Sequence, residues 1–132
     1  MKRLKIRCPY CGSLATKHPA SYVHGEKAEK GKFLYVCDRY PKCNSYVAAD
    51  KNGLPMGTLA NKKLRKKRIA AHKALDRLYK NNFMTKNQIY IWLQSKFGMS
   101  RKEMHIGNFG EYYCNRVIYE CNQAYRNMRT AN

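Results

Sequence analysis

The chain has 132 residues, enough for one or two small domains, and it carries 27 lysine and arginine residues against 8 acidic ones, a formal net charge of +19. Self-repulsion at this charge density destabilises a compact fold unless a polyanion binds, so we expect nucleic acid as the partner. The sequence contains no apolar run approaching the roughly 18 residues of a membrane-spanning helix and no lipidation motif, which argues against a membrane partner.

The N-terminal segment Met1–Arg7 is basic, and no apolar stretch follows it. It lacks the pattern of a secretory signal peptide, so we expect an intracellular protein whose thiols stay reduced. Met1–Arg7 is predicted to be a short strand or an ordered arm that leads into the first cysteine pair.

Four cysteines form two pairs: Cys8 and Cys11 are separated by two residues, and Cys37 and Cys43 by five. Two such pairs can supply the four thiolates of a tetrahedral zinc site. Gly12 can adopt the positive φ that the first tight turn requires. A closed shell of four thiolates leaves no position for water or substrate, so we expect one zinc ion with a structural role. The alternatives are disulfides, which need an oxidising compartment, or merely buried thiols.

Two histidines, His18 and His24, lie between the cysteine pairs and could replace a cysteine as a ligand. Because four cysteines already complete the shell, we expect both histidines to have ordinary surface roles.

Short aromatic or β-branched segments, bounded by glycine and turn residues, alternate with the cysteine pairs. We predict strands over Ala20–His24, Phe33–Val36 and Ser45–Ala49, with an exposed loop over Gly25–Lys32. Together they would form a small antiparallel sheet with zinc at one end, a zinc ribbon. With the helices expected after it, the predicted fold class is α+β.

The cysteine motifs carry a resemblance to known families. They are Cys8-Pro9-Tyr10-Cys11-Gly12 and Tyr35-Val36-Cys37-Asp38-Arg39-Tyr40-Pro41-Lys42-Cys43. Over about the first 50 residues the chain resembles the C-terminal zinc ribbons of bacterial type IA DNA topoisomerases, which implies binding of single-stranded DNA. With Pro55–Asn61 and a basic helix included, most of the chain more closely resembles a family of small bacterial and phage zinc-finger-containing proteins. This second resemblance implies that the protein is located in the cytoplasm of a bacterial cell or of a phage-infected host.

The segment Leu54–Gly57 is a predicted domain joint, because proline and glycine flank a change from strand-like to helix-like patterning. It divides a ribbon over residues 1–57 from a helical region over residues 58–132. We expect helices over about residues 61–79, 86–97 and 111–128, and a capping box at Ser100–Glu103.

The first predicted helix opens with six basic residues in seven. They are Lys62, Lys63, Arg65, Lys66, Lys67 and Arg68. Residues 58–82 carry 9 basic and 1 acidic residue, the most one-sided stretch of the chain. We predict that the six side chains contact phosphates with salt-dependent affinity; the alternative is a merely solvated helix face.

Beside the cysteine pairs, Tyr10 and Tyr40 could stack on unpaired bases while Arg39 and Lys42 hold the backbone. The alternative is that both tyrosine rings shield the zinc site.

Two further cysteines, Cys114 and Cys121, are seven residues apart on the apolar face of the last predicted helix. At about 1.5 Å of rise per residue their Cα atoms would be about 10 Å apart, beyond disulfide reach. We expect them to be core residues that pack near Trp92 and Phe97.

Catalysis is not expected. The acidic residues are scattered singly, so they do not form the carboxylate cluster of a two-metal nuclease, and the chain has no phosphate-binding glycine loop. A nuclease based on His72 or His105 remains an open alternative.

The function we predict is nucleic-acid binding. The ligand would be DNA, which the topoisomerase resemblance implies is single-stranded, or RNA. The alternative is an interaction protein that binds an acidic surface of RNA polymerase, the ribosome or another nucleic-acid enzyme as a regulator or inhibitor.

Overall fold

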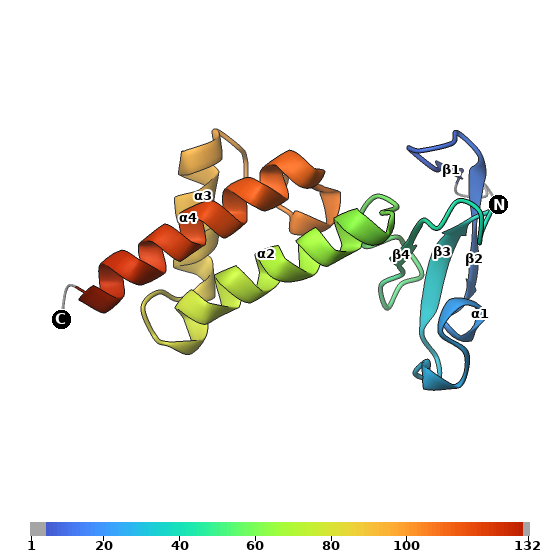
Figure 1. The fold of residues 1–132 in the computed structure, drawn as a ribbon, viewed down its shortest axis with the longest axis horizontal. Helices are drawn as coiled ribbons and strands as arrows, with labels where there is room; N and C mark the ends of the chain where they lie inside the picture. The colour runs from blue at the N-terminus through green and yellow to red at the C-terminus, as the bar shows by residue number, and fades with distance from the viewer. Residues whose placement is uncertain (1–4, 131–132) are drawn as a thin grey trace. The chain divides into compact units, whose positions relative to one another are not determined.

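The computed structural model describes residues 5–130 (Figure 1). An antiparallel sheet comes first in the chain and helices follow, which confirms the predicted α+β class. The elements are β1 (Ile6–Arg7), β2 (Leu14–Pro19), α1 (Ser21–His24), η1 (Gly25–Lys27), β3 (Phe33–Cys37), β4 (Tyr46–Ala48), α2 (Lys62–Lys80), α3 (Lys86–Phe97), η2 (Ile106–Asn108) and α4 (Glu111–Thr130). No helix within residues 5–130 is long and apolar enough to cross a membrane.

The chain divides into two compact units, one ending at Lys63 and the other starting at Leu64. Residues after the predicted joint at Leu54–Gly57 are still held by the ribbon, since Leu59 is buried in its core and Ala60 exchanges two backbone hydrogen bonds with Tyr46. The boundary therefore lies at the start of α2.

The four strands pair in the order β1-β2-β3-β4. Residues directly opposite in neighbouring strands share a face of the sheet. On one face, Leu34 and Val36 pack with Ala20, and on the other Tyr35 and Cys37 pack with the cluster that contains Leu59. Each face of the sheet thus has a small apolar cluster of its own.

The predicted strand Ala20–His24 is wrong. The partner of β3 is β2, which ends at Pro19, and Ser21–His24 forms the single helical turn α1. The segment Leu14–Pro19 is mostly exposed and polar, so its sequence lacks the apolar alternation of a strand, and its conformation comes from pairing with β3. The structure confirms strands at Phe33–Cys37 and Tyr46–Ala48. Of the predicted N-terminal arm, residues 1–4 lie outside the described residues, and Ile6–Arg7 forms β1.

The three predicted helices are confirmed as α2, α3 and α4, with ends within two residues of those expected. Helix α3 begins at a capping box in which the Gln88 N–H donates to Thr85 Oγ1 and the Thr85 N–H donates to Gln88 Oε1. The predicted capping-box bonds between Ser100 and Glu103 also form. A short turn and η2 follow them before α4.

The core of the helical unit is formed by the inner faces of its helices. Its buried side chains include Leu64, Ala71, Leu75 and Leu78 from α2, Ile89 and Leu93 from α3, and Cys114, Val117 and Cys121 from α4. Cys114 and Cys121 are fully buried free thiols, as predicted for core residues.

Arg68 belongs to this core, which corrects its assignment as a phosphate-binding residue. Its side chain is only 8% exposed. Its Nε and Nη2 atoms both donate to the carbonyl oxygen of Phe109, at 3.1 and 3.0 Å. Position 68 follows Leu64 by one helical turn, on the buried side of α2. The guanidinium thus ties α2 to Phe109, just before α4, and is not exposed for phosphate binding.

Replacing Arg68 tests this structural role. Arg68→Met keeps the aliphatic stem but leaves the buried carbonyl of Phe109 without these donors, so unfolding free energy should fall by about 2 kcal/mol in urea denaturation. The matched variant Lys66→Met, on the exposed side of the same helix, should change it by less than about 0.5 kcal/mol. Equal stabilities for the two variants would contradict the role assigned to Arg68.

Candidate metal centre

The first cysteine turn follows β1. The Cys8 N–H donates to the Ser13 carbonyl at 2.8 Å, and the Gly12 N–H donates to the Cys8 carbonyl at 2.9 Å. Gly12 has φ of +77°, the left-handed conformation that glycine adopts without a Cβ penalty. The chain therefore doubles back between Cys8 and Ser13, in the turn that contains Cys11.

The second turn begins at the last residue of β3. The Cys37 N–H donates to the Ser45 carbonyl, the Tyr40 N–H donates to the Cys37 carbonyl, and the Cys43 N–H donates to the Arg39 carbonyl. These backbone bonds close the longer loop between the two cysteines. The sheet register, in which Ala15 lies opposite Cys37, brings this loop to the same end of the sheet as the first turn.

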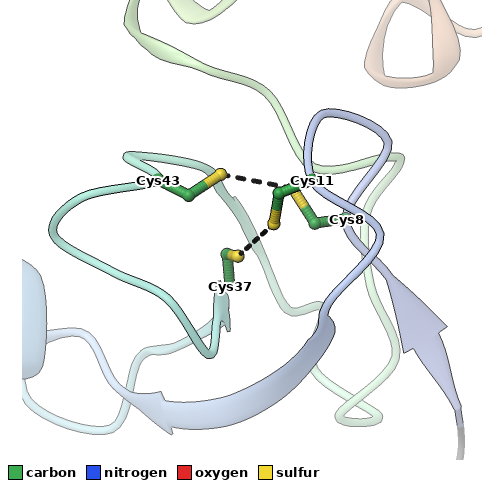
Figure 2. Close-up of side chains that lie close together, drawn as sticks. All are labelled: Cys8, Cys11, Cys37 and Cys43. Atoms are coloured by element: carbon green, nitrogen blue, oxygen red, sulfur yellow. Dashed lines mark hydrogen bonds between the residues drawn. The ribbon is translucent and has the colours of Figure 1, made fainter.

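The four sulfur atoms converge, as Figure 2 shows. All of them lie within 4.8 Å of one another, with Cys8 Sγ 3.5 Å from Cys43 Sγ and Cys11 Sγ 3.4 Å from Cys37 Sγ. In a zinc tetrahedron with Zn–S bonds of about 2.3 Å, neighbouring sulfurs are about 3.8 Å apart. The observed separations bracket this value, so the predicted ligands are brought together in a metal-binding arrangement. All four are free cysteines rather than disulfides.

The thiols differ in how readily they ionise. Burial raises the pKa of Cys37 to about 12 and also raises the pKa of Cys43. The side chain and backbone of Ser13, through hydrogen bonds, lower the pKa of Cys11 to about 6. A bound cation would favour the thiolate form of all four, because a coordinating thiol is deprotonated by the metal's charge.

The histidines between the pairs are engaged elsewhere. The His18 ring stacks on Tyr22, with centroids 4.0 Å apart, and the His24 ring meets Tyr46 edge to face. Neither belongs to the group of converging ligands.

The ribbon residues proposed to bind nucleic acid are placed differently from one another. Tyr10 is exposed and its hydroxyl accepts from the Asn61 N–H at 3.1 Å. Tyr40 is half-buried and packs against the cluster of Ala20, Leu34 and Val36. Arg39 and Lys42 are exposed.

The basic run of α2 is also split by the structure. Lys62, Lys63 and Lys66 are exposed, whereas Arg65 and Lys67 are half-buried. The Lys67 Nζ donates to Asn115 Oδ1 of α4 at 2.8 Å. Lys73 and Lys80 are not among the residues predicted to contact phosphates, yet both are exposed farther along α2. Their spacing of seven residues from Lys66 and from each other was the available signal, because it returns side chains to nearly the same side of a helix.

The histidines considered for catalysis lie in the helical unit. Partial burial lowers the pKa of His72; Asp76 opposes this shift and His105 adds to it. Among the described residues, the only group of at least three potential metal ligands is the four-cysteine set, so His72 and His105 are not part of a second one.

The sequence model of a family described as a zinc-finger-containing domain matches residues 4–124. No curated protein and no solved structure matches the chain.

Cysteine substitutions test whether the four converging cysteines bind a metal and the two core cysteines do not. Loss of a residue that only hydrogen-bonds to a metal ligand typically weakens metal affinity by about 10–100-fold. Cys37→Ser removes a proposed ligand itself, so it should weaken metal affinity by more than this. Cys114→Ser, in the helical core, should leave the metal content per chain unchanged. Elemental analysis of both purified variants would reveal this difference, and full metal content in Cys37→Ser would refute the ligand set.

Proposed function

Because the chain belongs to the family of zinc-finger-containing domains, we propose that Cys8, Cys11, Cys37 and Cys43 hold one structural zinc ion and that the protein binds nucleic acid. Four thiolate donors with this separation suit zinc in a closed, four-coordinate site. Zinc in such a site supplies folding energy and no catalytic position, so the proposed role of the protein is binding and not catalysis.

The observation that carries the nucleic-acid proposal is a row of lysines along the exposed side of α2. Its members are Lys62, Lys66, Lys73 and Lys80. At 100° per residue these positions fall within about 40° of one another around the helix. At about 1.5 Å per residue the row is about 27 Å long. The side of α2 that contains Leu64, Ala71 and Leu78 faces the core instead.

The charge of this row is poorly balanced by the chain itself. Asp76 is the single acidic residue in α2, and none of the four lysines forms an ion pair with a described residue. Regularly spaced cations on a rigid helix can neutralise successive phosphates and release their counterions, which supplies affinity without sequence specificity. Binding to an acidic protein surface is the competing explanation, and the experiment below separates the two.

Removing the lysine row should weaken binding and reduce its salt dependence. For the variant Lys66→Gln, Lys73→Gln, Lys80→Gln, we expect the slope of log K against log salt to be smaller in magnitude by about 2 to 3, because each lost phosphate contact contributes about 0.7 to 0.9. Fluorescence anisotropy with labelled oligothymidine, oligouridine and a dA·dT duplex at several salt concentrations measures this slope.

The matched control is Lys27→Gln, Lys30→Gln, Lys32→Gln, which removes the same charge from the exposed loop at the end of the sheet away from the cysteines. It should retain most of the affinity and slope. If both variants lose affinity and slope equally, binding responds to net charge alone, and the role proposed for the lysine row is contradicted. Absence of binding to all three probes, together with a protein partner whose capture survives nuclease treatment, would favour the acidic-surface alternative.

A further inference from the structure

Helices α2 and α4 present a common outer surface. They lie side by side and run in the same direction (Figure 1). Side-chain bonds link them at two levels: Lys67 donates to Asn115, and the Arg77 Nη2 donates to Asn122 Oδ1 at 2.8 Å. The Arg77 guanidinium also lies 3.9 Å from the ring centre of Tyr125. These contacts hold the two helices in register, so residues on their outer sides keep a defined spacing.

The outer side of α4 carries exposed tyrosines. Tyr112 and Tyr119 are 64% and 59% exposed, the two highest values among the large apolar side chains of the described residues. They are seven residues apart and therefore share one side of the helix. Cys114 and Cys121, also seven apart, occupy the buried side. The core is filled by the opposite face of α4. The Tyr112 ring meets Tyr113 edge to face, with ring centroids 5.1 Å apart, but more than half of each of the two tyrosines remains in solvent.

The tyrosines and the lysines point away from the same core. Lys66, Lys73 and Lys80 lie opposite the buried side of α2, just as Tyr112 and Tyr119 lie opposite the buried side of α4. Packed helices have axes about 8–10 Å apart, so a row of cations runs parallel to a row of rings at close range. Arg116 adds a further cation at the tyrosine row, since its Nη1 donates to Tyr112 Oη at 3.3 Å.

We propose that this two-helix surface, formed by Lys66, Lys73 and Lys80 of α2 and Tyr112 and Tyr119 of α4, binds unpaired nucleic acid. Phosphates lie along the lysine row, and bases stack on the tyrosine rings. In a duplex the bases are already stacked on each other and their faces are not available, so the surface favours single strands. This inference rests on the proposed function and adds which form of nucleic acid is bound and through which helix.

The test compares a single strand with a duplex. The protein should bind labelled oligothymidine more tightly than a dA·dT duplex of equal length at the same salt concentration. Tyr112→Ala, Tyr119→Ala should weaken oligothymidine binding by about tenfold or more, and duplex binding by less than about twofold because only phosphate contacts remain. The ring-preserving variant Tyr112→Phe, Tyr119→Phe should bind oligothymidine nearly as well as the parent, which separates lost stacking from lost folding.

Tyr79→Ala is the matched control, because Tyr79 is an exposed tyrosine on α2 that lies off the lysine row. It should bind both probes like the parent. The inference is overturned if the double alanine variant binds oligothymidine like the parent, or loses single-strand and duplex affinity equally while its circular dichroism is unchanged. If the inference fails in this way but binding still depends on the lysine row, the proposed nucleic-acid binding still holds. If the parent protein binds neither probe, the inference and the proposed function are both overturned.

Discussion

The convergence of four sulfur atoms from two turns that are far apart in sequence is the constraint on which the ribbon depends. Among the described residues, the apolar cluster on one face of its sheet has three buried members, Ala20, Leu34 and Val36, and the cluster on the other face includes Cys8 and Cys37 themselves. Burial of a large aliphatic side chain contributes about 1.5–3 kcal/mol, whereas a structural zinc ion contributes about 10–16 kcal/mol in zinc-finger peptides. In a unit this small, a metal at the sulfurs would be the largest single contribution to stability.

The helical unit is stabilised differently. Its core is apolar apart from the buried guanidinium of Arg68, and α2 divides sharply between a buried side with Leu64, Leu75 and Leu78 and an exposed side of lysines. Each pair of like charges four residues apart, such as Lys62 and Lys66, destabilises the helix by about 0.2–0.5 kcal/mol. Burial of the apolar side outweighs this repulsion. The remaining unfavourable charge would be relieved by a bound polyanion, which links the stability of this helix to the function proposed for it.

Local patterns in the sequence predicted the features that depend on local chemistry. Cysteine spacing predicted the four thiols that converge, and capping and apolar periodicity located α3 (Lys86–Phe97) at both ends. Features set by distant partners escaped: β2 owes its conformation to β3, and Arg68 is buried because the Phe109 carbonyl, far along the chain, accepts from its guanidinium. The rows on α2 and α4 had a signal in their seven-residue spacing, but only the contacts between the helices place them on one surface.

X-ray absorption at the zinc edge of the purified protein tests whether the four cysteines coordinate zinc, because it reports the atoms around the metal without reference to the fold. We expect one zinc ion with four sulfur neighbours at about 2.3 Å. A shell that contains nitrogen or oxygen in place of one of the sulfurs, or a folded ribbon that carries no metal, would contradict it.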